Sequence, residues 1–159
     1  MKFLFLAALA LAPLAPLDAQ TTAPATAVQP LDYSTATPIG GTWTYASTPG
    51  GSEATFTGPT GLPQVTIRCT RATRRVSIAK AATGAAPTIT IWTSSGTKAV
   101  LASYNPATAR LTAELAAFDA TLDAIAFSRG RVAFAAAGAP ALVVPAWAET
   151  ARVIEDCRV

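Results

Sequence analysis

The segment Gln64-Val65-Thr66-Ile67-Arg68-Cys69 alternates polar and apolar side chains without a break. Successive side chains of a β-strand point to opposite faces of the sheet, so this alternation predicts a half-buried strand with Val65, Ile67 and Cys69 on its inner face. The same period of two continues outward in both directions, from residue 41 to residue 114. Residues 43–45, 54–56 and 76–78 repeat it, and residues 88–93 are rich in β-branched side chains.

Turn-forming residues separate these runs at intervals of about 8 to 12 positions, the spacing of short antiparallel strands. Glycine, proline, serine and asparagine dominate the breaks because their backbones or side chains suit tight turns. The breaks are Pro49-Gly50-Gly51, Gly58-Pro59, Gly61-Leu62-Pro63, Thr83-Gly84, Ser94-Ser95-Gly96 and Asn105-Pro106. The pattern predicts a mainly β fold, either an antiparallel β-sandwich or a small barrel.

The period changes in the C-terminal half of the chain. Over residues 117–127, Phe118, Leu122 and Ile125 recur at the spacing of one helix face, and Gly130 is placed to end that helix. Residues 131–135 and 141–144 return to strand patterns. Pro145 is expected to open a second helix, because proline is tolerated in a first helical turn. The inward stripes of this second helix would be Trp147, Ala151 and Ile154, with Thr150, Val153 and Cys157 alongside.

Two cysteines, Cys69 and Cys157, are the only ones in the chain. In an oxidising compartment such a pair most simply forms one disulfide. Cys69 would face inward from its strand and Cys157 from the last helix, so the bond would hold that helix against the sheet. The pair predicts a structural link, since redox catalysis would favour a Cys-x-x-Cys motif or a nearby histidine.

The N-terminus has the pattern of an export signal. Lys2 precedes an apolar run over residues 3–11, and Ala19 offers a small residue before a cleavage point. The expected organisation is a signal peptide (1–19), a flexible Thr/Ala/Pro-rich leader (20–38) and a single β-rich domain (39–159). We expect a periplasmic or secreted protein without a stable membrane anchor; a short, uncleaved anchor is the alternative.

Several stretches resemble known exported proteins. Residues 122–131 (LDAIAFSRGR), 145–149 (PAWAE) and 152–158 (RVIEDCR), with 68–71 (RCTR) and 74–78 (RRVSI), are similar to the tail and central hairpin of small uncharacterised exported proteins of alphaproteobacteria. One mid-chain cysteine and one near the end is a layout similar to the invasion-associated locus B family of envelope proteins. These resemblances imply a β-rich exported protein and carry over no catalytic residue.

Composition argues against familiar enzyme classes. The chain has no histidine, so Ser-His-Asp and Cys-His nucleophile arrangements are excluded. Two distant cysteines without histidine do not form a zinc motif, and scattered acids do not form a calcium loop, so we expect no metal and no cofactor. Ser77–Lys80 and Ser95–Lys98 match Ser-x-x-Lys but fall in a strand and a turn instead of one helical turn.

The paired carboxylates Asp119 and Asp123 are one helical turn apart. They could serve as an acid–base pair if one were desolvated. The alternative is that they face solvent at the start of a helix, where the helix dipole favours negative charge. We expect the second arrangement.

Three features could carry binding. Arg68, Arg71, Arg74 and Arg75, with Lys80 further along, form a basic hairpin that could hold phosphate or carboxylate groups, or simply keep an exposed hairpin soluble. Arg129 and Arg131 flank Gly130 and are expected to be solvent-exposed charges. Trp92 shares a strand face with threonines, and is either a core residue or an exposed platform for a sugar or peptide. The net charge of +3 and a charged fraction of 13% are low for a nucleic-acid binder, so nucleic acid is not an expected partner.

The function expected from these features is non-enzymatic: an exported protein that interacts with an anionic envelope component or with another envelope protein. A small secreted inhibitor of a hydrolase is the alternative, with residues 58–63 as its protruding loop. An enzyme of unrecognised type is the third hypothesis, and it would require a deep pocket that holds Asp119, Asp123 or Glu53 against arginine or serine partners.

Overall fold

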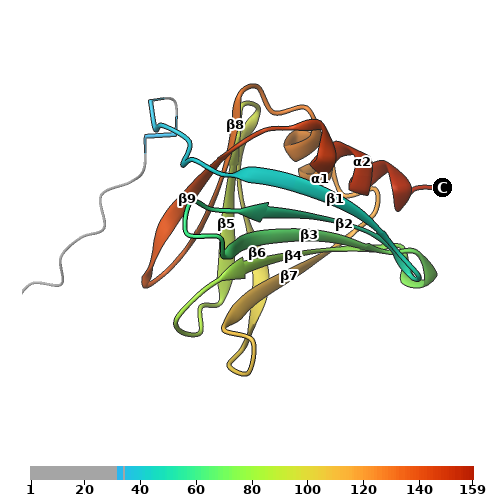
Figure 1. Cartoon of the computed structure of the whole chain (residues 1–159), viewed down its shortest axis with the longest axis horizontal. Coiled ribbons are helices and arrows are strands. Elements are labelled where there is room, and N and C mark those ends of the chain that lie inside the picture. The colour runs from blue at the N-terminus through green and yellow to red at the C-terminus, as the bar shows by residue number, and fades with distance from the viewer. Residues whose placement is uncertain (1–31, 34) are drawn as a thin grey trace, which may run out of the picture. The chain divides into compact units, whose positions relative to one another are not determined.

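Antiparallel strands form one continuous, strongly curled sheet (Figure 1). The structure is a computed structural model that describes residues 32–33 and 35–159, so the expected signal peptide and most of the expected leader lie outside the described residues. The strands of this part are β1 (Thr42–Thr48), β2 (Gly51–Thr57), β3 (Pro63–Thr70), β4 (Arg75–Ala81), β5 (Thr88–Thr93), β6 (Gly96–Asn105), β7 (Arg110–Ala116), β8 (Arg131–Ala136) and β9 (Ala139–Pro145). The helices are the 3-10 turn η1 (Arg71–Thr73), α1 (Ala120–Ala126) and α2 (Ala148–Asp156).

The strand order is β1-β2-β3-β4-β7-β6-β5-β8-β9, and every neighbouring pair is antiparallel. Strand β6 changes its pairing partner along its length. Its first part pairs with β5 up to Leu101, and its last part pairs with β7 from Ala102 onward. The fold is therefore a half-barrel, mainly β with two α-helices in the C-terminal half, which confirms the fold class expected from the sequence.

The inner face of the curled sheet carries the core. Alternate residues of each strand point inward, as the period of two predicts. The inward side chains that are most completely buried are Phe56, Val65, Ile67, Val76, Ile78, Ile89, Ile91, Leu111 and Phe134. Two hydrogen bonds bring the two edges of the sheet toward each other: the Ile39 amide donates to Val143 O at 2.9 Å, and Trp43 Nε1 donates to Pro145 O at 2.9 Å.

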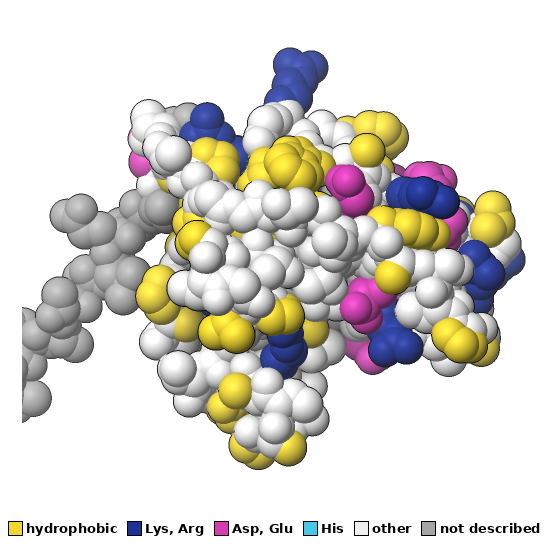
Figure 2. Space-filling model, viewed as in Figure 1, with side chains coloured by type: hydrophobic (Ala, Val, Ile, Leu, Met, Phe, Trp, Pro, Cys, Tyr) yellow, Lys and Arg dark blue, Asp and Glu magenta, His cyan; other side chains and the backbone are white. Residues whose placement is uncertain are grey.

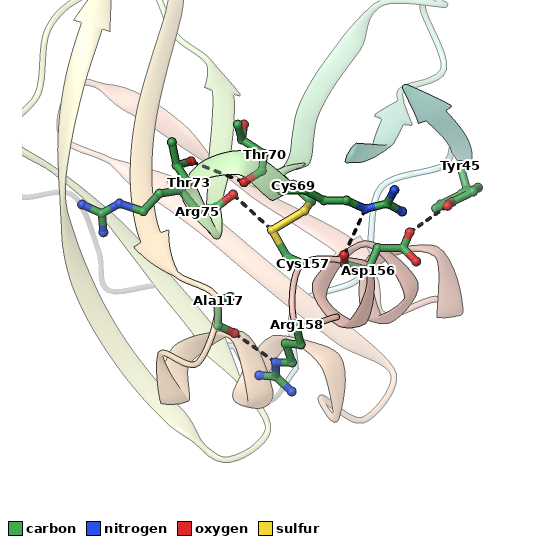
Figure 3. Close-up of a disulfide and its surroundings, with 10 residues drawn as sticks. Tyr45, Cys69, Thr70, Thr73, Arg75, Ala117, Asp156, Cys157 and Arg158 are labelled. Carbon is green, nitrogen blue, oxygen red and sulfur yellow. Dashed lines mark hydrogen bonds between the residues drawn. A yellow bond between two sulfur atoms is a disulfide. The ribbon is translucent and has the colours of Figure 1, made fainter. Parts of the chain in front are cut away.

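Helix α2 lies across β1, β2 and β3 and beside α1. Its buried residues are Thr150, Val153 and Ile154, and a disulfide joins Cys157, directly after the helix, to Cys69 on β3 (Figure 3). The Cα atoms of the two cysteines are 5.4 Å apart. The expected disulfide is thus present, and it fixes the end of α2 against the inner face.

The prediction that Phe118 and Trp147 point inward is wrong. Phe118 precedes α1 and is 66% exposed, because Asp119 caps the helix and delays its start to Ala120. Trp147 is 42% exposed at the N-cap of α2, because Pro145 ends β9 and does not open the helix. Phe118 lies two residues and Trp147 one residue before the first residue of its helix, so neither side chain belongs to the buried helix face.

Hydrogen bonds also hold the short described stretch before β1. The Tyr33 hydroxyl donates to Arg131 O and lies 3.2 Å from Ser128 Oγ, and an Arg131 guanidinium nitrogen donates to Ala36 O. The last residues of the expected leader therefore contact the loop between α1 and β8.

The backbones of β2 and β3 approach each other closely next to the disulfide. Gly51 begins β2 with a φ of +156°, and a Cβ atom built there would lie 2.2 Å from Cys69 O. No side chain larger than hydrogen fits at this distance. The neighbouring Gly50 has no atom within 4 Å of its Cβ position.

We therefore expect Gly51→Ala to lower the free energy of unfolding by about 1–3 kcal/mol through strain and displacement of β3. Gly50→Ala is the matched control and should change stability far less, since its side chain would enter open space. Urea denaturation followed by circular dichroism measures both. Equal stabilities of the two variants would contradict the close approach of β2 and β3.

The disulfide closes a long loop, since 88 positions separate the cysteines. In the chain-entropy model, a loop of this length adds about 4–5 kcal/mol to the free energy of unfolding. Reduction should therefore lower the urea midpoint, and hydrogen exchange should become fast in α2 before it does in β3 and β4. Uniform exchange across the domain after reduction would show that the bond does not specifically hold α2.

Candidate functional site

The arginine corner, which we define as Arg68, Arg71, Arg74 and Arg75, surrounds the turn between β3 and β4. Its backbone is shaped by η1, and Arg74 adopts the left-handed conformation (φ 49°, ψ 46°) that reverses the chain. All four side chains are exposed. Within the described residues, none of them forms an ion pair.

The four arginines of the corner do not converge on one point. Arg71 is directed toward the end of α2, where its Nε donates to Asp156 O at 3.4 Å. Arg75 extends away from the disulfide, on the far side of β4 (Figure 3). The alternation of β3 and β4 places Arg68 and Arg75 on the outer face of the sheet, opposite to Cys69 and Val76. The corner therefore contributes two arginines to one common face.

That outer face is hollowed into a shallow depression of about 490 Å³, which we call the outer groove. It runs across β2, β3, β4 and β7. Most of its lining residues carry polar groups, hydroxyls from threonine and serine and guanidinium groups from two arginines. The lining residues are Glu53, Thr55, Pro63, Thr66, Arg68, Ser77, Ala79, Arg110 and Thr112.

Arg110 is held firmly at one end of the outer groove. Its two terminal nitrogens donate to Ala79 O at 3.2 Å and to Pro63 O at 3.1 Å. Glu53 lies opposite Arg68 in the strand register but accepts a hydrogen bond from Thr55 Oγ1 at 3.2 Å. No ion pair neutralises Arg68 or Arg110 among the described residues, so both positive charges remain available to a ligand.

The other sequence-derived candidates lie elsewhere. Trp92 is half-buried on the outer face of β5, where it pairs in register with Thr97 and Ala133. The loop over residues 58–63 is closed by backbone hydrogen bonds from Gly58 N to Leu62 O and from Gly61 N to Gly58 O, and it exposes Leu62. Trp92 is not among the residues that line the outer groove, whereas the loop reaches the groove only through Pro63. The inhibitor hypothesis stays a prediction.

The paired carboxylates of α1 have separate structural partners. Asp119 caps the helix by accepting from Thr121 N at 2.8 Å and pairs with Lys98 Nζ at 3.2 Å. Asp123 pairs with a terminal nitrogen of Arg158 at 2.6 Å, and Arg158 Nε also donates to Ala117 O. Hydrogen bonds from Thr121 and the ammonium of Lys98 hold the pKa of Asp119 below its ordinary value. Both carboxylates are thus engaged in joining α1 to its neighbours.

Lys80 occupies a position that the sequence reasoning missed. It was grouped with the basic hairpin, yet the alternation Val76, Ile78, Lys80 places it on the inner face of β4, where it is 5% exposed. It lines a second cavity of about 500 Å³ between the end of β4 and the start of β9, which we call the inner pocket. The strand alternation alone would have indicated the inward direction.

The surface in Figure 2 shows charged side chains of both signs close together at the end where α2 lies. At the opposite end of this face, hydrophobic and uncharged groups predominate. Among the described residues, no helix has the length and apolar character needed to cross a membrane. No family model, curated protein or solved structure shows significant similarity to the chain, so the resemblances noted in the sequence stay predictions.

The lowered pKa of Asp119 leads to a pH-dependent expectation. A carboxyl whose folded pKa lies below its unfolded value of about 3.9 stabilises the fold above that pH, and this stabilisation disappears as the pH falls through the folded pKa. Asp119→Asn keeps an acceptor oxygen at the cap but removes the charge. Its stability deficit relative to the parent chain should be present at pH 7 and should shrink as the pH falls below the unfolded value and through the lowered folded pKa of Asp119.

Urea denaturation at pH 7 and at pH 3 measures this difference. Asp119→Ala is the comparison variant, since loss of the cap should cost about 1 kcal/mol even where charge no longer matters. A deficit of Asp119→Asn that is the same at pH 7 and pH 3 would contradict the assigned role of the charge.

Proposed function

We propose that the chain is an exported, non-enzymatic protein that binds an anionic polymer of the cell envelope along the outer groove. The observation that carries this proposal is the placement of Arg68, Arg75 and Arg110 on one outer face without ion-pair partners among the described residues. Guanidinium groups bind carboxylates and phosphates through paired, directional hydrogen bonds.

The spacing of these arginines suits an extended ligand. In the register of β4 with its neighbours, Arg75 lies at one end of the strand, while Arg110 pairs with Ala81 at the other end. Six residues of strand separate these levels, which corresponds to about 20 Å. Arg68 lies between them, diagonal to Arg75. A small anion could contact one of these positions, whereas a chain with repeated charges could contact all three.

The floor of the outer groove matches such a ligand chemically. Thr55, Thr66, Ser77 and Thr112 present hydroxyl groups between the arginines. Hydroxyl groups can both donate and accept hydrogen bonds, as the hydroxyls of a sugar do. The combination of hydroxyls and guanidinium groups therefore favours an anionic polysaccharide over a purely apolar partner.

The proposal also includes an oxidising compartment outside the cytoplasm and a role without catalysis. The disulfide supports an oxidising compartment, where such bonds persist. The carboxylates considered as catalytic acids, Asp119 and Asp123, cap α1 and pair with Lys98 and Arg158. Their engagement supports a binding role over acid–base chemistry.

The test uses oligomers of polygalacturonate as the anionic probe and dextran oligomers of the same length as the neutral one. We expect the purified chain to bind the anionic oligomer and not the neutral one, with affinity that falls as salt rises, because counter-charges on both partners become screened. The double variant Arg68→Gln/Arg75→Gln should bind at least about tenfold more weakly, the equivalent of 1.4 kcal/mol.

The matched control removes the same charge elsewhere. Arg129 is exposed in the loop before β8, so Arg129→Gln together with Arg152→Gln lowers the net charge equally without touching the outer groove. Equal weakening by the control pair, or equal binding of charged and neutral oligomers, would contradict a site in the outer groove. Isothermal titration calorimetry gives all the affinities.

A further inference from the structure

Lys80 is a cation placed in the core of the half-barrel. In the register of the sheet it lies between Val65 of β3 and Leu111 of β7, both of which are completely buried. Its own side chain is 5% exposed. Lysine is rarely buried without a partner, because its ammonium group loses the hydration that stabilises its charge.

The described residues supply very little to replace that hydration. Lys80 Nζ donates one hydrogen bond, to Ala81 O at 3.2 Å, and no carboxylate lies within ion-pair distance of it in the described part of the chain. An ammonium has three donors, so two N–H groups have no acceptor from these residues. Burial accordingly lowers the pKa of Lys80.

The inner pocket next to Lys80 has the size and lining of a small-ligand site. Its volume of about 500 Å³ falls within the range of about 300–1,000 Å³ that is usual for such sites. Most of its wall is aliphatic, from the segment before β1, the end of β4 and the start of β9. The residues that matter here are Ile39, Ala82, Pro140 and Leu142 for the apolar wall and Lys80 and Gln64 for the polar part.

We propose that the inner pocket binds a single-chain amphiphile with an anionic head group, which pairs with Lys80 while the alkyl chain contacts Ile39, Pro140 and Leu142. The buried ammonium supplies the complementary charge, and the Gln64 amide is a second polar group in the same pocket. An anion at this position would provide acceptors for the two N–H groups of Lys80 that have none among the described residues. The aliphatic wall would remove the alkyl chain from water at a gain of roughly 0.8 kcal/mol per methylene group.

This site is separate from the outer groove. Lys80 and Leu142 lie on the inner face of the sheet, while Arg68 lies on the outer face. The two sites take different ligands, an alkyl chain with one charge and a polar polymer with many. Failure of one proposal therefore leaves the other standing.

The experiment measures binding of decanoate, decyl phosphate and decanol to the purified chain by isothermal titration calorimetry, below the concentrations at which they form micelles. We expect at least one of the two anions to bind ten times or more tightly than decanol, and their ratio distinguishes a carboxylate head group from a phosphate one. Equal affinity for the anions and for decanol, or no binding of any of the three, would overturn the proposal.

The decisive variant is Lys80→Met, which keeps the length of the side chain and removes the charge. It should fold and denature at a higher urea concentration than the parent chain, because the substitution removes a buried charge that has no counter-ion among the described residues. Its preference for the anions over decanol should disappear. Lys98→Met is the control, since Lys98 is an exposed lysine that pairs with Asp119, and it should retain the preference.

A second variant tests the pocket without touching the charge. Ala139 lines the inner pocket at the start of β9, so Ala139→Trp should fill part of it and weaken decanoate and decanol alike. Unchanged binding in both Lys80→Met and Ala139→Trp, with circular dichroism showing both folded, would place the ligand elsewhere and overturn the proposal.

Discussion

The disulfide between Cys69 and Cys157 determines which end of the inner face of the curled sheet is covered by α2. Along β3 and β4 the inner-face residues form three successive pairs: Cys69 with Val76, Ile67 with Ile78, and Val65 with Lys80. The disulfide attaches the end of α2 at the first pair. Lys80 lies at the third pair, four strand residues from Val76, which is about 13 Å away. The helix therefore covers one end of the inner face, and the inner pocket lies toward the other.

The polar contacts of α2 reinforce this asymmetry. Tyr45 Oη donates to Asp156 at 2.7 Å, the Arg152 guanidinium lies over the Tyr45 ring, and Arg158 connects α2 to the segment before α1. Burial alone would raise the pKa of Asp156, but the Tyr45 hydrogen bond and the charges of Arg71 and Arg152 hold it below its ordinary value. The charge of Asp156 is thus compensated by its neighbours at this end. Lys80 at the other end and Arg68, Arg75 and Arg110 on the outer face lack ion-pair partners among the described residues, and these are the charges we assign to ligands.

Much of the fold could be predicted from alternation alone, because a strand with one buried face must repeat every two residues. That rule placed Val65, Ile67 and Cys69 inward correctly, and it would also have placed Lys80 inward if its charge had not suggested an exposed position. The helix starts were less predictable. Asp119 caps α1 through its side chain, and Pro145 ends β9, so the apolar residues just before the two helices, Phe118 and Trp147, lie outside the core.

Strand order and the directions of the side chains around the β3–β4 turn were beyond sequence reasoning for a different reason: they depend on contacts between distant segments. The change of partner along β6, which curls the sheet, has no local signature. The same holds for the basic hairpin, where Arg71 is directed toward α2 and Arg68 toward the outer groove. The outer groove also includes Arg110, which is far from the hairpin in sequence and was not a candidate.

The most direct test of a buried, ligand-binding Lys80 at the end of the sheet away from α2 is the titration of the lysine side chains, followed by NMR with ¹³C at Cε. Lysine occurs only at positions 2, 80 and 98, and the Lys80→Met variant assigns the signal of Lys80. The account predicts that the pKa of Lys80 lies below the ordinary value for lysine, because its ammonium is buried and has no counter-ion among the described residues, and that decanoate raises this pKa. A Lys80 signal that titrates at the ordinary value for lysine, and that does not respond to decanoate or decyl phosphate, would contradict a buried cation that binds an anionic ligand.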